Sequence, residues 1–127
     1  MKKILIAALL LLGACSQDNT MTLKTGSYKL KNSMHNVPTI LTLSKDGKLN
    51  AKVVNVIMGE YTTSQDNITI TPGGTTMMMG PQEEMEAEQN FIQALPLIRK
   101  YKMQESNLVL ILENGGELIF EPYTEPK

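Results

Sequence analysis

The segment GGTTMMMGPQEEMEAEQNF, residues 73–91, decides the fold because it joins the end of a strand to the start of a helix. Three consecutive methionines separate a glycine pair from a proline and a glutamate-rich run. Pro81 suits the first position of a helix, where its missing N–H costs nothing, and Glu83 and Glu84 favour the positive end of the helix dipole. The segment therefore predicts a helix that begins at Pro81.

Apolar residues then recur at i, i+4, i+7, i+8 and i+11, which is the stripe of an amphipathic helix that packs on a core. They are Ala87, Phe91, Ala94, Leu95 and Ile98. Pro96 is expected to end or distort the helix before Ile98, because the residue before a proline disfavours helical angles.

Short strands separated by turns are predicted on both sides of this helix. Residues 68–71, ITIT, alternate apolar and polar side chains, so one face of that strand is buried. Asp46-Gly47 is a hairpin signal, and residues 48–56, KLNAKVVNV, are expected to form one strand after it. The sequence as a whole predicts an α+β domain with one helix and about seven antiparallel strands.

The first fifteen residues, MKKILIAALLLLGAC, have the layout of a secretory signal: two lysines, an apolar run and small residues before Cys15. Nine apolar residues at about 1.5 Å each reach about 14 Å, which is too short to span a bilayer as a helix. Residues 12–15, LGAC, resemble the lipoprotein box of bacteria, in which cleavage precedes a lipidated cysteine. An ordinary signal peptide is the alternative.

This interpretation divides the chain into a lipoprotein signal peptide (1–14), a lipidated cysteine with a short tether (15–25) and a folded domain (26–127). Cys15 is the only cysteine, so no disulfide can form within the chain. Several acyl chains on Cys15 would anchor the protein stably to a membrane. Ser16 in place of aspartate favours the outer membrane, by resemblance to the sorting rule of enteric-type bacteria. We expect a monomer in the cell envelope that faces the periplasm.

The charge balance excludes one function class. Residues 15–127 carry 10 basic and 13 acidic groups, because two of the 12 basic residues, Lys2 and Lys3, lie in the signal. A net charge of about −3 gives no basic surface for nucleic acid, so no nucleic-acid binding is expected. The chain length suits one domain with its own core.

The second half of the sequence is similar to a known family. A threonine, a short methionine-containing segment, a proline, a helix with one inward glutamate, a tyrosine-containing strand and a hairpin follow one another in residues 68–120. In this order they resemble the META domain family, which includes the heat-shock protein HslJ. The resemblance extends from about Gly26 to Phe120 and implies strands wrapped around one helix, in proteins that are frequently secreted or lipid-anchored. It also implies association with envelope stress or drug tolerance, and it brings no catalytic residues.

The resemblance also identifies positions in the first half. Asn55, Gly59 and Tyr61 fall on the family's glycine-cysteine-asparagine loop and the tyrosine that follows it. Two positions at which the family frequently carries cysteine hold Val54 and Gly80 here, which is compatible with the loss of an interacting pair.

The methionine triplet allows two interpretations. In a strand, Met77 and Met79 share one face and Met78 points to the other, so the three cannot chelate one ion together. Packing in the core is favoured, and Met78 falls on the family's own methionine position. The alternative is a copper site in which Met77 and Met79 are joined by other donors, because Cu(I) favours converging thioethers. The candidate donors are Met58, Met34 and His35.

Glu88 is expected to belong to a structural polar network. It shares a side of the predicted helix with Met85, Phe91 and Ile92, and a carboxylate beside a core must be paired. We expect it to accept hydrogen bonds from the Asn55 loop or from the Thr75-Thr76 backbone, and so to hold helix to sheet.

The remaining polar features favour no catalytic site. His35, the sole histidine, lies in a loop and is expected to be solvated. Residues 82–88, QEEMEAE, predict a solvated helix face, with an acidic patch for a basic partner as the alternative. No nucleophile–histidine–acid set, CxxC pair or phosphate-cradling loop is present in the sequence, so no enzyme activity and no cofactor are expected.

Together these observations predict a lipid-anchored, non-enzymatic envelope protein with a binding or structural role in envelope stress or drug tolerance. Two alternatives remain open. One is an inhibitor-like module that captures a secreted or periplasmic enzyme. The other is a copper-binding lipoprotein that uses methionine ligands.

Overall fold

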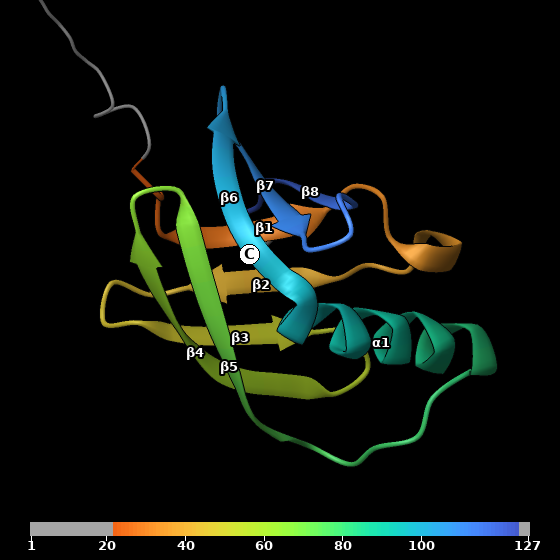
Figure 1. The fold of residues 1–127 in the computed structure, drawn as a ribbon. Coiled ribbons are helices and arrows are strands. Elements are labelled where there is room, and N and C mark those ends of the chain that lie inside the picture. Colours follow the sequence, from red (N-terminus) through yellow and green to blue (C-terminus); the bar gives the residue numbers. More distant parts are fainter. Residues whose placement is uncertain (1–21, 125–127) are drawn as a thin grey trace, which may run out of the picture.

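The computed structural model describes residues 22–124, which form eight strands and one α-helix (Figure 1). The predicted signal peptide and Cys15 lie outside the described residues. Within residues 22–124, no helix has the length and hydrophobicity needed to cross a bilayer. The elements are β1 (Gly26–Leu30), η3 (Met34–Asn36), β2 (Ile40–Leu43), β3 (Lys48–Lys52), β4 (Val56–Ser64), β5 (Asn67–Thr75), α1 (Gln82–Ala94), η4 (Leu95–Leu97), β6 (Ile98–Gln104), β7 (Asn107–Leu112) and β8 (Glu117–Pro122).

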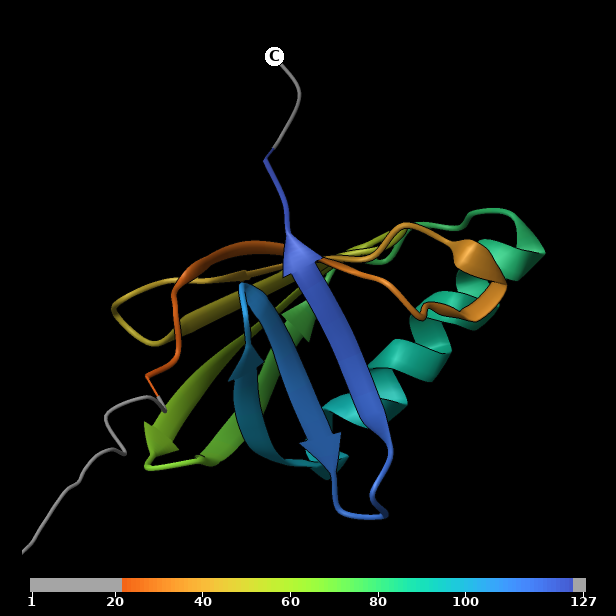
Figure 2. The ribbon, with the colours of Figure 1, turned by 90° about the horizontal axis from the view of Figure 1, so that it is seen from above.

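The eight strands form a closed antiparallel barrel. Each strand lies beside the next one in sequence, and β8 pairs with β1 to close the sheet. The seam between β5 and β6 is the sparsest, with Asn67 opposite Lys100 and the Tyr101 N–H donating to the Asp66 carbonyl at 3.0 Å. The chain between these two strands forms α1, which lies across one end of the barrel (Figures 1 and 2).

The α+β class with antiparallel strands is confirmed, but two details of the prediction are wrong. The barrel has eight strands rather than about seven. Its interior is filled by side chains of the strands themselves, and the strands do not wrap around α1. Residues 48–56 are also not one strand, because the chain reverses between β3 and β4 at Val53–Asn55. Neither glycine nor proline marks this turn, so the sequence gives no local signal for it.

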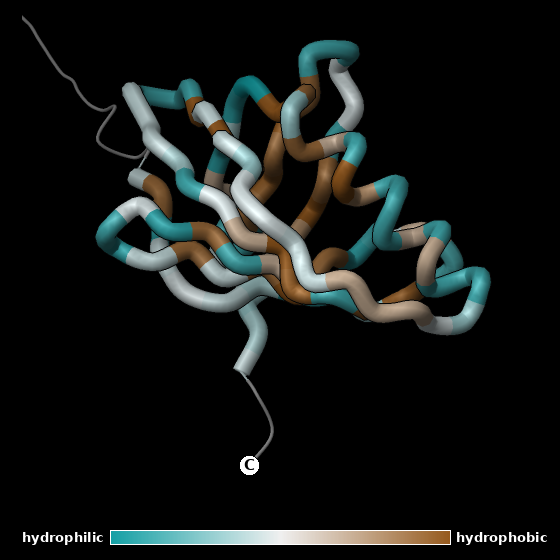
Figure 3. Tube along the Cα trace, turned by 90° about the horizontal axis from the view of Figure 1, so that it is seen from below, coloured by the Kyte–Doolittle hydropathy of each residue, from teal (hydrophilic) through white to brown (hydrophobic). Residues whose placement is uncertain are grey.

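The core consists of side chains that point into the barrel from alternate positions along each strand. In β3, for example, Leu49 and Ala51 are buried whereas Lys48, Asn50 and Lys52 are exposed. Figure 3 shows the most hydrophobic segments on the strands and mainly hydrophilic residues at the loops.

The helix closes its end of the barrel with aromatic and aliphatic side chains. Phe91 is buried, and its ring meets that of Phe120 edge to face at a centroid distance of 6.5 Å. Leu95 of η4 belongs to the same core. Pro96 follows at the end of α1, and the last turn tightens there into η4, as expected from its sequence.

The other end of the barrel holds the segment before β1. The Tyr28 hydroxyl donates to the Lys24 carbonyl at 2.6 Å, and Leu23 packs against the core. The Tyr61 hydroxyl donates to the Ser44 carbonyl at 2.5 Å. Residues 22–25, which the sequence assigned to the tether, therefore lie against the folded domain.

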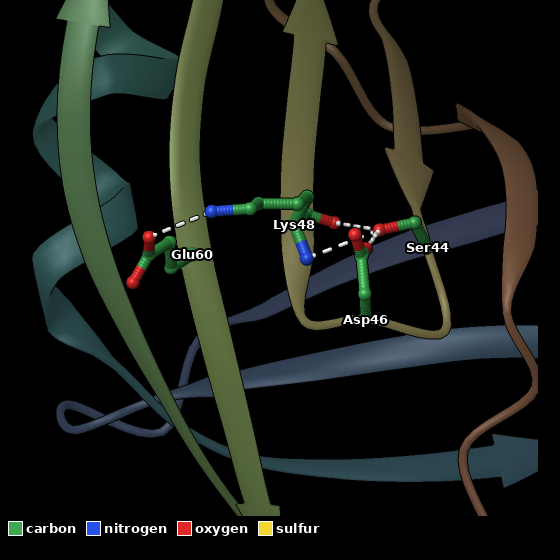
Figure 4. Close-up of polar contacts among 4 residues, drawn as sticks. All are labelled: Ser44, Asp46, Lys48 and Glu60. Atoms are coloured by element: carbon green, nitrogen blue, oxygen red, sulfur yellow. Dashed lines mark hydrogen bonds and ion pairs between the residues drawn. The ribbon is translucent and has the colours of Figure 1, made fainter.

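The β2–β3 turn shows the predicted hairpin at Asp46-Gly47 (Figure 4). The Ser44 hydroxyl donates to the Asp46 carboxylate and accepts the Lys48 N–H at 3.1 Å. Gly47 adopts a φ of 85°, which favours glycine. Lys48 Nζ then donates to Glu60 Oε2 at 3.0 Å, which links the turn to β4.

Candidate functional site

Glu88 lies on the inward side of α1 and is only 4% exposed. Its Oε1 accepts the Asn55 N–H at 2.6 Å and the Val54 N–H at 3.0 Å. Its Oε2 accepts the Asn55 side-chain amide at 2.7 Å. Three donors thus replace the water that a buried carboxylate loses. They also satisfy the backbone of the β3–β4 reversal, which explains how that turn forms without glycine or proline.

Asn55 continues the network toward the methionines. Its Oδ1 accepts the Thr76 hydroxyl at 2.9 Å and the Met78 N–H at 2.5 Å, and its Nδ2 also donates to the Met78 carbonyl at 3.1 Å. The Asn55 amide therefore pairs with the Met78 backbone as a neighbouring strand would. Thr76 completes the link by accepting the Val56 N–H at 3.0 Å.

The structure thus brings together all three residues of the predicted polar network, Asn55, Thr76 and Glu88. Of the two partners considered for Glu88, the Asn55 loop is the one that it contacts. Thr76 joins through Asn55 rather than through a direct bond to the carboxylate. The network ties the start of β4, the segment after β5 and α1 to one another.

The methionines do not pack as predicted. Residues 76–80, which we call the methionine loop, lie outside any strand and leave Met77 and Met79 about nine-tenths exposed, at 90% and 88%. Met78 is 53% exposed. The packing prediction assumed that β5 continues through the triplet, but β5 ends at Thr75. The Met78 backbone then pairs with Asn55 instead of with a strand, and the methionine side chains face outward.

His35 is not simply solvated. Its Nε2 lies 2.9 Å from Glu86 Oε1, so η3 is held to the outer side of α1. The Gln82 amide and His35 lower the pKa of the Glu86 carboxyl. Within the acidic run, Glu83 and Glu84 are exposed as predicted, whereas Glu88 is buried.

The two positions at which the META domain family frequently carries cysteine are neighbours in space. A Cβ placed on Gly80 would lie 3.1 Å from Val54 Cγ1 and 3.7 Å from Val54 Cβ. The valine side chain therefore occupies the space in which a cross-link between these positions would lie.

Sequence reasoning missed Met85 and Glu86. Together with Gln82 and Gln89 they fall at i, i+3, i+4 and i+7, which was the one available signal that they share an outer face of the helix. Both line one hollow with Met79, and Glu86 contacts His35. These placements depend on the methionine loop and on η3, which sequence periodicity does not place.

No group of three or more histidine, cysteine, aspartate or glutamate side chains suited to a metal ion lies within residues 22–124. In the same residues, every buried side-chain nitrogen or oxygen has a hydrogen-bond partner. The Glu88 carboxylate is thus occupied by its structural donors.

Comparison with solved structures identifies the same fold elsewhere. An NMR structure of a protein from Burkholderia xenovorans superposes with a TM-score of 0.65 at 22% sequence identity, covering 81% of this chain and 85% of that chain. A crystal structure of a DUF4847 family protein from Bacteroides vulgatus superposes with a TM-score of 0.62 at 16% identity, covering 80% of this chain and 95% of that chain. At these identities the likeness concerns the fold alone.

The sequence comparisons give the family. No curated protein matches the chain. The family model described as the META domain matches residues 19–125, which include every strand and the helix described above. The chain therefore belongs to the META domain family.

Proposed function

We propose that this protein is a non-enzymatic binding module of the bacterial cell envelope that presents its methionine loop to a protein partner. Lipid on Cys15 would hold it at a membrane, with the outer membrane favoured by Ser16. The observation that carries the proposal is the exposure of three adjacent methionines on a loop whose backbone is fixed by a buried asparagine.

Exposure of these side chains does nothing for the fold. Burying one methionine side chain stabilises a protein by about 1.5–3 kcal/mol, and Met77 and Met79 forgo nearly all of that. Contiguous exposed apolar surface is typical of interaction sites. Methionine also adapts its shape to different apolar partners because it is unbranched and flexible.

The polar network supports binding in a second way. Asn55 fixes the position of the Met78 backbone in the free protein. A loop that is ordered before binding loses less conformational entropy when a partner docks. The methionine side chains can therefore adapt while the backbone that carries them stays in place.

Envelope attachment rests on residues 1–15, with their lysines, apolar run and lipoprotein-box resemblance. The role in envelope stress or drug tolerance is what the resemblance to the META domain family implies. The inhibitor-like alternative would make the captured partner a secreted or periplasmic enzyme.

The test is position-specific photo-crosslinking in cells that make the full chain. A photoreactive residue at Met77 should capture a defined partner, whereas one at Met58, also exposed but on the barrel wall, should not. The purified partner should then bind the protein and lose affinity for a Met77→Ser, Met79→Ser variant. Equal capture from both positions, or unchanged affinity of that variant, would exclude the methionine loop as the binding surface.

Two further comparisons separate the parts of the proposal. A Cys15→Ser version should leave the membrane fraction and capture less partner, because anchoring raises the local concentration. An enzyme partner that loses its activity on binding would establish the inhibitor-like alternative.

A further inference from the structure

The large apolar side chains that this domain exposes are of a single kind. Within residues 22–124 they all belong to methionine: Met34, Met58, Met77, Met78 and Met79. No methionine in these residues is fully buried, and the core is built from leucine, isoleucine, valine, alanine, phenylalanine and tyrosine. Methionine is among the residues that proteins most often bury. Its placement at the surface therefore indicates that the thioether has a use there that an aliphatic side chain lacks.

Thioethers differ from aliphatic side chains because their sulfur can be oxidised to a sulfoxide. An oxidant dissolved in water has to reach the sulfur, so the reaction is fastest where the side chain is most exposed. Met77 and Met79 are exposed at 90% and 88%, about twice the 44% of Met58 on the barrel wall. Met103 packs against the core. The methionine loop therefore offers the most accessible thioethers of residues 22–124.

The fold can accept an oxidised side chain at this loop. The Asn55 side chain holds the Met78 backbone, and these hydrogen bonds use no methionine side chain. An oxygen added to the sulfur of Met77 or Met79 would meet solvent rather than core atoms. Oxidation of a packed methionine disrupts a core, whereas oxidation here would change only the polarity of the surface.

We propose that Met77 and Met79 form a reversible oxidation site, at which hydrogen peroxide converts the apolar methionine loop into a polar one while the barrel stays folded. The sulfur lone pair attacks one peroxide oxygen, an S–O bond forms as the O–O bond breaks, and the other oxygen leaves as water. The sulfur loses two electrons and the peroxide gains them.

A methionine sulfoxide reductase supplied with a dithiol reverses this step. The sulfoxide oxygen then leaves as water, and the dithiol is oxidised to a disulfide. The oxidation site does not depend on a protein partner. Its consequence for docking rests on the proposed function: a polar loop would no longer hold an apolar partner surface.

The direct test exposes the purified chain carrying Cys15→Ser to hydrogen peroxide and follows each methionine by tandem mass spectrometry. The substitution removes the one thiol that competes for the oxidant. Met77 and Met79 should be oxidised first, about 2-fold faster than Met58 and at least roughly 10-fold faster than Met103. The circular dichroism spectrum and the urea midpoint should stay those of the untreated chain.

Hydrophobic-interaction chromatography then measures the polarity of the folded surface. The oxidised chain should elute earlier, and a methionine sulfoxide reductase with dithiothreitol should restore its elution. Met77→Gln with Met79→Gln imitates the polarity of the sulfoxides and should elute early without peroxide. Met77→Leu with Met79→Leu stays apolar and cannot be oxidised at these positions, so it should lose most of the peroxide-dependent shift. Met58→Leu is the matched control and should keep that shift.

Three results would overturn the site. One is oxidation of Met58 or Met34 as fast as that of Met77 and Met79, which would show no preference for the loop. Another is a lower urea midpoint once the loop methionines are oxidised. The third is a shift of full size in the Met77→Leu, Met79→Leu variant. Both side chains are almost fully exposed, so loss of the fold would not obscure these results.

Discussion

The two segments that flank Pro81 differ in which side chains they bury, and in both the burial is the opposite of what hydropathy would predict. Glu88 of α1 is 4% exposed, whereas Met77 and Met79 of the methionine loop are 90% and 88% exposed. Both placements follow from the same hydrogen bonds, because Glu88 satisfies the β3–β4 reversal and Asn55 of that reversal holds the Met78 backbone. Around Pro81, the requirement that backbone N–H groups have hydrogen-bond acceptors therefore decides which side chains are buried.

The largest expected effect comes from removing the carboxylate. Glu88→Ala would leave the backbone N–H groups of Val54 and Asn55, and one N–H of the Asn55 side-chain amide, without an acceptor. Each unsatisfied buried donor costs about 1–3 kcal/mol. We expect the free energy of unfolding in urea to fall by at least about 3 kcal/mol. Glu83→Ala, on the exposed first turn of α1, is the matched control and should change it by less than about 0.5 kcal/mol. Similar values for both variants would contradict the role given to Glu88.

A disulfide should stabilise the same region by a comparable amount. The Cβ positions of residues 54 and 80 are 3.7 Å apart, within the range of about 3.5–4.5 Å found in disulfides. In a Cys15→Ser background, Val54→Cys with Gly80→Cys should oxidise spontaneously and raise the free energy of unfolding by about 3 kcal/mol over the reduced form. The urea midpoints with and without reductant give this value. Failure to oxidise in the folded state would show that the methionine loop lies elsewhere in solution.

Removing Asn55 should have a smaller but more local effect. Asn55→Ala frees the Met78 backbone, yet Glu88 keeps two backbone donors, so we expect a loss of about 2 kcal/mol. Hydrogen exchange should become much faster at the Met78 amide than at amides in the middle of β7. Unchanged exchange at Met78 would mean that something other than Asn55 fixes the loop.

The end of the barrel that holds the segment before β1, with the hydroxyls of Tyr28 and Tyr61, provides a contrast that depends on pH. Burial raises the pKa of the hydroxyls of Tyr28, Tyr61 and Tyr101 above the ordinary value of 10.0. A raised folded-state pKa gives stability that is complete below the unfolded pKa and is lost as pH rises through the folded pKa. Urea unfolding should therefore show a free energy that falls above about pH 10, while tyrosinate absorbance rises. Tyr61→Phe should reduce the slope, and an unchanged slope would contradict a contribution from this hydroxyl.

The smallest effect is expected where the apolar side chains are most exposed. Met77→Ser combined with Met79→Ser removes two large side chains that the fold does not bury, so the free energy of unfolding should stay within about 0.5 kcal/mol of the parent. Urea unfolding checks this beside Glu88→Ala. A loss of several kcal/mol would mean that the methionines pack in solution.

Sequence patterns predicted what depends on local chemistry. Proline, the two early glutamates and the apolar stripe predicted α1, and strand alternation predicted most of the barrel. The burial of Glu88 followed from its place beside apolar helix positions. These inferences use neighbours within one or two turns, and such neighbours are visible in a sequence.

What the sequence did not reveal depends on contacts between distant segments. The turn at Val53–Asn55 exists because Glu88 supplies its acceptors from another element. The methionines face outward because Asn55 replaces a neighbouring strand. His35 meets Glu86 through an irregular turn that carries no periodicity. None of these contacts produces a pattern among residues that are close in the sequence. The turn therefore forms without turn residues, and the methionines are exposed despite their hydropathy.

If the proposed lipid on Cys15 holds the chain at a bilayer, the docking of residues 22–25 against Tyr28 and the core would limit the distance between the domain and the bilayer. With lipid on Cys15, only residues 16–21 would remain as spacer, and six residues reach at most about 20 Å. Figures 1 and 2 show α1 on the side of the barrel away from this segment. With so short a spacer, the end of the barrel that holds Tyr28 and Tyr61 would face the lipid. The methionine loop would then face the aqueous side, where a protein partner could reach it.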